Sequence, residues 1–252
     1  MKNKIALITG ATSGIGRAAA LTLAKIGYSI IATGRRGERL EELGQELGDK
    51  VAFLPLVFDV RDLEKVQEIL GNLPQDWKAI DVLINNAGNA HGMDPIQTGD
   101  LDDWDAMIDI NVKGLLYVSK AIIPGMCERK SGTIINIGSI AGKEVYPNGN
   151  VYCGSKHAVD AITDGMRLDL NPFGIRVVGI HPGLVETEFS LVRFKGDESR
   201  SEKVYQGFEP LVAQDIADVV EFVVTRPAHV TIADVVILPT AQASATVVKK
   251  EL

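Results

Sequence analysis

Short apolar runs alternate with amphipathic stretches along most of the chain. The apolar runs are typical of buried strands, whereas apolar residues that recur at intervals of three and four predict helices. Strands are expected at residues 4–9, 28–33, 51–57, 81–88 (with a turn), 132–137, 175–180 and 234–238. Helices are expected at residues 17–26, 38–47, 63–70, 102–126, 152–170 and 215–224. Strands that alternate with helices in this way indicate an α/β fold.

The chain shows no linker, low-complexity tract or internal repeat, so residues 1–252 are expected to form one domain. Residues 190–207 are its most polar segment and carry charges of both signs. Such a segment could be a flexible lid over a substrate, a surface helix, or both. We place the expected lid at residues 188–210.

Composition narrows the class of protein. Hydrophobic residues make up 46% of the 252 and charged residues 23%, which suits a globular domain with a sizeable core. A net charge of −7 without a basic block argues against a nucleic-acid or anionic-membrane partner. No apolar run approaches the ~20 residues that span a bilayer, and the first ten residues lack an export signal. Cys127 and Cys153 match no metal or redox spacing, so free thiols in a reducing cytoplasm and no metal site are expected.

A glycine-rich turn, Gly10-Ala11-Thr12-Ser13-Gly14-Ile15-Gly16, lies directly between the first strand and the first helix. Glycines let the backbone approach a ligand, and a helix N-terminus offers free N–H groups to phosphate. The spacing differs from the commoner Gly-x-Gly-x-x-Gly fingerprint, and a turn of this kind can be purely structural. The strand before it and the helix after it favour nucleotide binding.

The second and third strands end in charged residues. A dinucleotide fold that prefers NAD places an acid after the second strand, where this chain has Gly34-Arg35-Arg36. Arg35 and Arg36 could instead hold the 2′-phosphate of NADP, or they could be two solvated arginines. Asp59 could accept the adenine amino group, or it could cap the helix at residues 63–70.

Asparagines mark two further positions. The side chains of Asn85 and Asn86 can tie neighbouring strands together, while Ala87-Gly88 lets a cofactor lie against the backbone. Asn111 sits inside the helix predicted at residues 102–126, where an amide competes with the backbone for hydrogen bonds. It therefore either faces solvent or has a function.

Tyr152 and Lys156 lie four residues apart and so share one face of a helix. An ammonium near a phenol favours the phenolate and would lower the tyrosine pKa from its usual ~10, which suits proton transfer to a carbonyl or from an alcohol. The spacing alone is also common on solvated helix faces. Ser139 follows the strand at residues 132–137, at the edge of the sheet where open parallel sheets bind ligands.

Together these motifs resemble the short-chain dehydrogenases/reductases. The matching stretches are Thr9-Gly10-x3-Gly14-Ile15-Gly16, Asn85-Asn86-Ala87-Gly88, Asn111, Ser139, Tyr152-x3-Lys156 and Pro182-Gly183. The resemblance implies a doubly wound, Rossmann-like sheet of about seven parallel strands with helices on both faces. It also implies that Tyr152 is the acid/base, Ser139 orients the substrate oxygen and Lys156 contacts the nicotinamide ribose. Asn111 would hold a water in a proton relay.

A closer resemblance is to the NADP-dependent 3-hydroxy acid (serine) dehydrogenases. It is carried by Gly34-Arg35-Arg36, Asn136-Ile137-Gly138-Ser139, Gly149-Asn150-Val151-Tyr152 and the stretch at residues 188–197. Such enzymes oxidise L-serine, L-allo-threonine or 3-hydroxypropionate-type acids with NADP, reduce the matching semialdehydes, and form homotetramers. Where that group commonly has a Gly pair, this chain has Glu186 alone before Thr187, which could reshape the mouth of the site.

The resemblance and the residues together give one set of candidates. The expected cofactor contacts are Gly10, Thr12, Ser13, Gly14, Ile15, Gly16, Arg35, Arg36, Asp59, Val60, Asn86, Ala87, Gly88, Tyr152, Lys156, Pro182, Gly183, Val185 and Thr187. Substrate contacts are expected from Ser139, Tyr152 and Arg193, whose guanidinium suits a carboxylate unless it is a solvated lid residue. The alternative functions are reduction of a 3-oxoacyl thioester or another carbonyl, and NADPH sensing without turnover.

Overall fold

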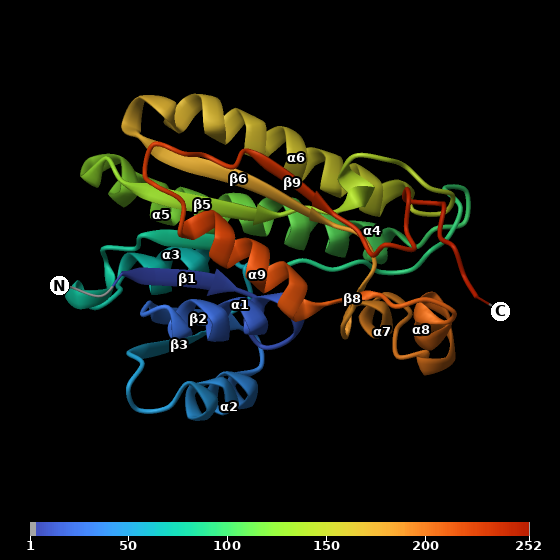
Figure 1. The fold of residues 1–252 in the computed structure, drawn as a ribbon, viewed down its shortest axis with the longest axis horizontal. Coiled ribbons are helices and arrows are strands. Elements are labelled where there is room, and N and C mark those ends of the chain that lie inside the picture. The colour runs from blue at the N-terminus through green and yellow to red at the C-terminus, as the bar shows by residue number, and fades with distance from the viewer. Residues whose placement is uncertain (1–3, 252) are drawn as a thin grey trace.

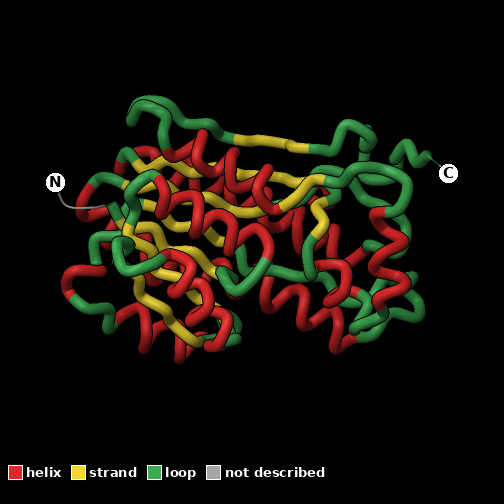
Figure 2. Tube along the Cα trace, turned by 60° about the horizontal axis from the view of Figure 1, so that its bottom comes forward, coloured by secondary structure: helices red, strands yellow, loops and turns green. Residues whose placement is uncertain are grey.

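The computed structural model describes residues 4–251, so the basic start of the chain at residues 1–3 lies outside the described part. Seven strands form one parallel sheet in the order β3-β2-β1-β4-β5-β6-β9, with helices on both sides (Figures 1 and 2). The strands are β1 (Ile5–Thr9), β2 (Ser29–Gly34), β3 (Phe53–Val57), β4 (Val82–Asn85), β5 (Gly132–Ile137), β6 (Ile175–Pro182) and β9 (Asp234–Ile237). The predicted doubly wound, Rossmann-like sheet is therefore confirmed.

The two faces of the sheet are covered by different helices, because its central strands are apolar on both sides. One face packs against α1 (Gly14–Lys25), α2 (Gly37–Leu47) and α9 (Ala213–Val224). The other packs against α3 (Leu63–Gly71), α5 (Leu115–Arg129) and α6 (Asn150–Leu170). The strand order reverses between β1 and β4, and such a reversal opens a crevice at the carboxyl ends of the strands.

The single helix predicted at residues 102–126 is wrong in one respect. The structure divides this stretch into α4 (Leu101–Ile108), a π-helical turn η2 (Asp109–Gly114) and α5. Apolar spacing does not reveal a π turn, which adds a residue without breaking the helix. The turn contains Asn111, so it changes the direction in which that side chain points.

The polar segment after β6 is helical and lies beyond the carboxyl ends of the strands (Figure 1). It contains α7 (Phe189–Arg193) and α8 (Glu198–Tyr205), and a small two-stranded parallel sheet of β7 (Val185–Glu186) and β8 (Leu211–Val212) frames it. Three short 3-10 turns complete the described elements, η1 (Gln75–Trp77), η3 (Ile140–Gly142) and η4 (Asn171–Phe173). Within residues 4–251, no helix has both the length and the apolar character needed to cross a bilayer.

Candidate active site

The glycine-rich turn follows β1 at the carboxyl ends of the strands, beside the loop after β4. Gly10 and Gly14 have φ angles of 67° and 52°, which side-chain-bearing residues rarely adopt. A β-carbon at Gly10 would also lie 3.0 Å from the α-carbon of Ala87. Asn86 fixes the turn from the β4 side, because its Nδ2 donates to the carbonyl oxygens of Thr9 (2.9 Å) and Gly10 (3.2 Å). The predicted tie between these strands is confirmed.

The N-terminus of α1 is open to an anion. Its cap residue Ser13 makes no side-chain hydrogen bond to the helix, and the first turn carries no acid. The first N–H groups of the helix therefore keep their capacity to bind phosphate. Thr187 lies directly above, since a β-carbon at Gly14 would be 3.3 Å from its Cγ2. The first turn of α1 is thus free to bind a phosphate group, and Thr187 lies against the glycine-rich turn at Gly14.

Arg36, at the end of β2, points toward the glycine-rich turn. Its Nη2 donates to Thr12 Oγ1 (3.0 Å) and Ser13 Oγ (2.9 Å), and its Nη1 donates to Glu188 Oε2 (3.0 Å). Arg39 donates to the other oxygen of Glu188 (2.5 Å). Arg35 is 58% exposed, with Asp59 at 3.8 Å. Of the two predicted phosphate-binding arginines, only Arg36 reaches the turn.

Asp59 does not cap α3, so that alternative is wrong. Asp62 is the cap residue, and its Oδ1 accepts from the backbone N–H of Lys65 at 3.0 Å. Asp59 instead accepts bonds from the backbone and the guanidinium of Arg61. Burial raises the pKa of Asp59, but the bonds from Arg61 outweigh it and the net pKa is lowered. Asp59 is thus an ionised carboxylate beside the end of β3.

Tyr152 and Lys156 lie near the start of α6, and each is only 7% exposed. Burial raises the pKa of Tyr152, the neighbouring Tyr146 adds to this, and a hydrogen bond with Ser139 lowers it in part. Burial also lowers the pKa of Lys156 to about 8, and its Nζ donates to the carbonyl oxygen of Ile137 at 3.0 Å. The prediction that Lys156 lowers the pKa of Tyr152 is therefore wrong for this structure, because desolvation dominates both groups.

Asn111 is 2% exposed, which rules out the solvent-facing alternative. Its amide exchanges two bonds with the backbone of Asn89, at 2.8 and 2.9 Å, and donates a third to Ser155 Oγ at 3.0 Å. A β-carbon at Gly88 would lie 2.8 Å from Asn111 Oδ1 and 3.5 Å from Lys156 Nζ. The π turn thus joins the loop after β4 to α6 and brings Asn111 and Lys156 to the same side of Gly88.

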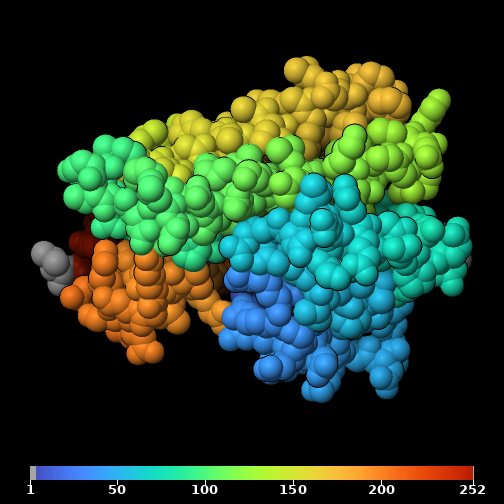
Figure 3. Space-filling view, turned by 180° about the vertical axis from the view of Figure 1, so that it is seen from behind, coloured from blue at the N-terminus to red at the C-terminus, as the bar shows by residue number. Residues whose placement is uncertain are grey.

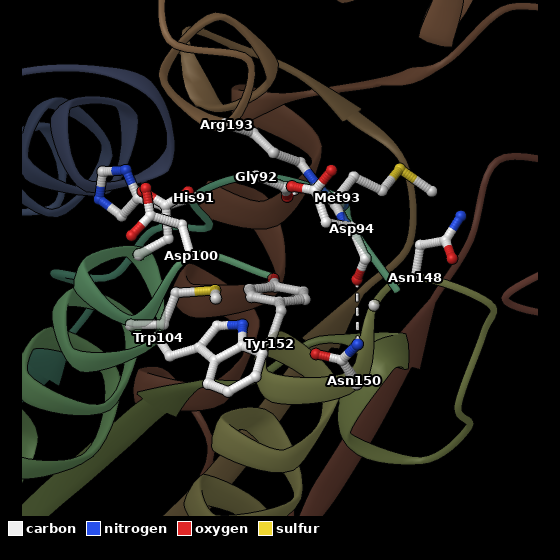
Figure 4. A pocket seen from close by; sticks show the side chains of 13 residues that line it. His91, Gly92, Met93, Asp94, Asp100, Trp104, Asn148, Asn150, Tyr152 and Arg193 are labelled. Carbon is white, nitrogen blue, oxygen red and sulfur yellow. Dashed lines mark hydrogen bonds between the residues drawn. The ribbon is translucent and has the colours of Figure 1, made fainter. Parts of the chain in front are cut away.

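Arg193, the last residue of α7, faces the phenol ring of Tyr152 across a pocket (Figure 4). Its guanidinium carbon lies 5.6 Å from the ring centre of Tyr152 and 5.5 Å from that of Tyr146. Its Nε donates to the carbonyl oxygen of Gly92 at 3.3 Å, while its Nη2 is buried without a partner among residues 4–251. The pocket has about 260 Å³ of space, part of it open to solvent, and Trp104 and Met107 also line it. A small anion would satisfy the unpartnered nitrogen.

Comparison with known proteins identifies the family to which this chain belongs. A family model described as short chain dehydrogenase matches residues 4–197. The chain belongs to this family. NADP-dependent 3-hydroxy acid dehydrogenase YdfG of Escherichia coli O6:H1 is 47% identical over 242 residues, 96% of this chain and 97% of the relative. Sulfoacetaldehyde reductase 2 of Chromohalobacter salexigens is 46% identical over 240 residues, 95% of each chain.

A solved structure is similar over the same extent. The closed form of serine dehydrogenase complexed with NADP+ has a TM-score of 0.92 and 45% identity, and the match covers 98% of this chain and 100% of that one. The family predicted from the sequence is therefore confirmed. The resemblance to the 3-hydroxy acid dehydrogenases is supported by both the sequence and the structural relatives.

The candidate site also contains residues that the sequence did not indicate. Arg39 and Glu188 lie 149 positions apart, and only the fold shows that they meet. The ring of Tyr146 lies beside the guanidinium of Arg193, and Ser155 receives the bond from Asn111. The loop after Gly183 is held from the tail, because Gln242 Oε1 accepts from the backbone N–H of Leu184 at 2.9 Å. Local patterns carry no signal for any of these contacts.

One group outside this site has the spacing of metal ligands, formed by Asp160, His181 and Asp234. The ammonium of Lys143 lies between the two carboxylates, at 2.7 Å from Asp160 and 2.9 Å from Asp234. Burial lowers the pKa of His181, more than the two acids raise it. Lys143 therefore already supplies the positive charge that these acids need.

Proposed function

We propose that this short-chain dehydrogenase transfers a hydride between NADP and the hydroxyl-bearing carbon of a small 3-hydroxy acid. L-serine, L-allo-threonine and 3-hydroxypropionate are examples, and the reverse reaction reduces the matching semialdehydes. The observation that carries the proposal is the unpartnered guanidinium nitrogen of Arg193, which faces Tyr152 across the pocket. A guanidinium binds a carboxylate in a bidentate manner, so it would hold the acid group while the hydroxyl lies at Tyr152.

The lining of the pocket supports a small anionic substrate. Arg193 offers its unpartnered nitrogen beside Tyr152, in a space that Trp104 and Met107 also border. The relative named sulfoacetaldehyde reductase supports a second candidate, because a sulfonate aldehyde has the same arrangement of an anion near a carbonyl. Arg193 could bind either anion.

The residues around the crevice suit NADP. The open N-terminus of α1 and the glycine-rich turn would hold the pyrophosphate, and Arg36 with Thr12 and Ser13 would hold the 2′-phosphate. The relatives named as NADP-dependent and as an NADP+ complex support the same cofactor. The remaining predicted contacts at Ile15, Val60, Pro182, Gly183, Val185 and Thr187 belong to this proposal. Bound NADP supplies the hydride chemistry.

The chain itself handles the proton. Burial favours the phenol form of Tyr152, which would donate its proton to a carbonyl oxygen during reduction and leave a phenolate. In the oxidation direction the phenol first loses its proton to the relay, and the phenolate then takes the proton of the substrate hydroxyl. Ser139, which partly offsets the rise in the pKa of Tyr152, would hold the same oxygen. Asn111 uses both hydrogens of its amide on protein partners but keeps a lone pair on Oδ1 for a water beside Lys156. That water would relay the proton toward solvent.

A panel of substrates tests the proposal. Small 3-hydroxy acids, sulfoacetaldehyde, neutral ketones and 3-oxoacyl thioesters are assayed by absorbance with NADP(H) and NAD(H). We expect the highest kcat/KM with NADP(H) and a small anionic substrate. Turnover of thioesters alone would select the second enzyme function. Binding of NADPH without turnover of any substrate would select a sensor.

We also propose that the protein is a cytoplasmic homotetramer. Several large apolar side chains are exposed on α4, α5, α6 and the edge strand β9, including Leu101 (67%), Leu116 (39%), Leu168 (77%) and Val236 (46%). An unpaired edge strand and apolar helix faces of this kind favour association between copies. Light scattering that gives a mass other than four times 27.1 kDa would contradict the tetramer. The free thiols of Cys127 and Cys153 support a reducing compartment.

A further inference from the structure

The short helix α7 reaches both ends of the active site. Glu188 precedes its first residue and contacts the arginines after β2, whereas Arg193 at its other end faces Tyr152. In Figure 3 the orange segment that contains α7 and α8 lies beside the blue segment of the N-terminal third. One helix thus joins the region expected to bind adenosine to the substrate pocket.

The carboxylate of Glu188 is divided between two guanidinium groups. One oxygen lies 3.0 Å from Arg36 and the other 2.5 Å from Arg39. Arg36 in turn uses its other terminal nitrogen, Nη2, on the hydroxyls of Thr12 and Ser13 in the glycine-rich turn. An anion bound at that turn must therefore share Arg36 with Glu188. Without a bound ligand, the positive charges of Arg36 and Arg39 both face the single carboxylate of Glu188.

We propose that Glu188 sets the preference between NADP and NAD by competing with the 2′-phosphate for Arg36. The proposal rests on the NADP dependence proposed above and adds a residue to it. A 2′-phosphate carries close to two negative charges, so a carboxylate on the same guanidinium opposes it through like-charge repulsion. NAD has no such group and does not meet this repulsion. Glu188 therefore limits how strongly NADP is favoured and links that choice to the position of α7.

The exposure of the pair makes this exchange of partners feasible. The side chains of Arg36 and Glu188 are 44% and 41% exposed, so their ion pair is worth little and can be exchanged. Burial raises the pKa of Glu188, but the bonds from Arg39 and Arg36 outweigh it, so the carboxylate stays charged at neutral pH. Arg39 can keep one oxygen of Glu188 while Arg36 turns to the phosphate.

The test compares equilibrium binding rather than turnover. Titration calorimetry measures the Kd of NADP+, NAD+, adenosine 2′,5′-bisphosphate and AMP for the wild type and for Glu188→Gln. We expect Glu188→Gln to raise the affinity ratio of NADP+ to NAD+ by about fivefold, and the ratio of the two fragments by a similar factor. The fragments lack the nicotinamide, so they report on the adenosine end alone.

Glu186→Gln is the matched control. It removes the same charge two residues earlier, at the end of β7, where Glu186 is exposed and has no ion pair among residues 4–251. Its ratio should stay within about twofold of the wild type, since a solvent-exposed charge without a partner contributes little. An unchanged or lower ratio in Glu188→Gln overturns the inference, because Glu188 would then hold the arginines in place or act only on the lid. Failure of the wild type to bind either dinucleotide would instead overturn the proposed function.

Discussion

The two ends of the crevice are built on opposite principles. At the end proposed to bind adenosine, charged side chains such as Arg36 and Glu188 are about half exposed and pair with each other. At the end proposed for catalysis, Tyr152 and Lys156 are 7% exposed and Asn111 is 2% exposed. Water can stabilise charges that change partners at the first end, whereas the second end must hold its groups through fixed hydrogen bonds.

The difference shows in the pKa values. At the exposed end, ion pairs keep the carboxylates charged, and the pKa values of Asp59 and Glu188 are both lowered on balance. At the buried end, desolvation favours neutral forms, so the pKa of Tyr152 rises and that of Lys156 falls to about 8. Below about pH 8 Lys156 is an ammonium, and above it the charge is lost. Exposure therefore permits the charged groups to exchange ion-pair partners, whereas burial determines the pKa values of Tyr152 and Lys156.

The largest expected effect comes from the buried hydroxyl. Tyr152→Phe should lower kcat by at least about a thousandfold, because it removes the proton donor but keeps the ring that packs 5.7 Å from that of Phe189. NADPH affinity should stay within about twofold, since the adenosine end is untouched. Steady-state kinetics and fluorescence titration measure the two quantities. A variant that keeps more than a few per cent of kcat would show that Tyr152 is not the acid/base.

Features that depend on the local pattern of residues are predicted well from the sequence. Apolar runs gave the seven strands of the sheet, and the glycine-rich turn lies where its flanking strand and helix indicated. The prediction that Asn85 ties neighbouring strands also holds, because its Nδ2 donates to Asn136 Oδ1 at 2.8 Å. The strands and the turn are determined by residues that are close in sequence or that repeat with the period of a strand or helix, whereas the partner of Asn85 comes from the neighbouring strand β5.

Predictions that needed the environment of a side chain were less accurate. The spacing of Tyr152 and Lys156 shows a shared helix face but not that both groups are buried, so the direction of the tyrosine pKa was wrong. Adjacent arginines cannot be told apart by pattern, and only Arg36 faces the turn. Glu188 meets Arg39 through the fold alone. Desolvation and long-range contacts are properties of the folded chain.

A smaller effect on stability should separate the buried from the exposed polar contacts. Asn136 is fully buried, accepts from Asn85 at 2.8 Å and donates to Thr163 at 2.9 Å. Asn136→Ala leaves both partners short of a bond and should lower the free energy of unfolding by about 2 kcal/mol, measured by urea denaturation. Lys65→Ala removes an exposed pair with Glu68 and should shift the midpoint by no measurable amount. Equal shifts in the two variants would remove the distinction.

The smallest expected effect tests Arg193, which carries a charge into the buried end. Arg193→Ala should raise KM about tenfold for small anionic substrates, because the variant loses a charge-assisted bidentate contact worth roughly 1.4 kcal/mol. Neutral ketones should keep their KM within about twofold, because they lack the group that a guanidinium would bind.

Arg200→Ala is the control for Arg193, because this arginine also belongs to the expected lid but stacks on Phe194, 4.4 Å from the ring centre. It removes one lid charge without removing the nitrogen that faces Tyr152. If Arg193→Ala raises KM equally for acids and ketones, Arg193 holds the lid through Gly92 rather than the substrate. If Arg200→Ala raises KM for acids, but not for ketones, as much as Arg193→Ala does, the effect comes from the total positive charge of the expected lid. Only selective loss in Arg193→Ala identifies a charge placed at the buried end for an anionic substrate.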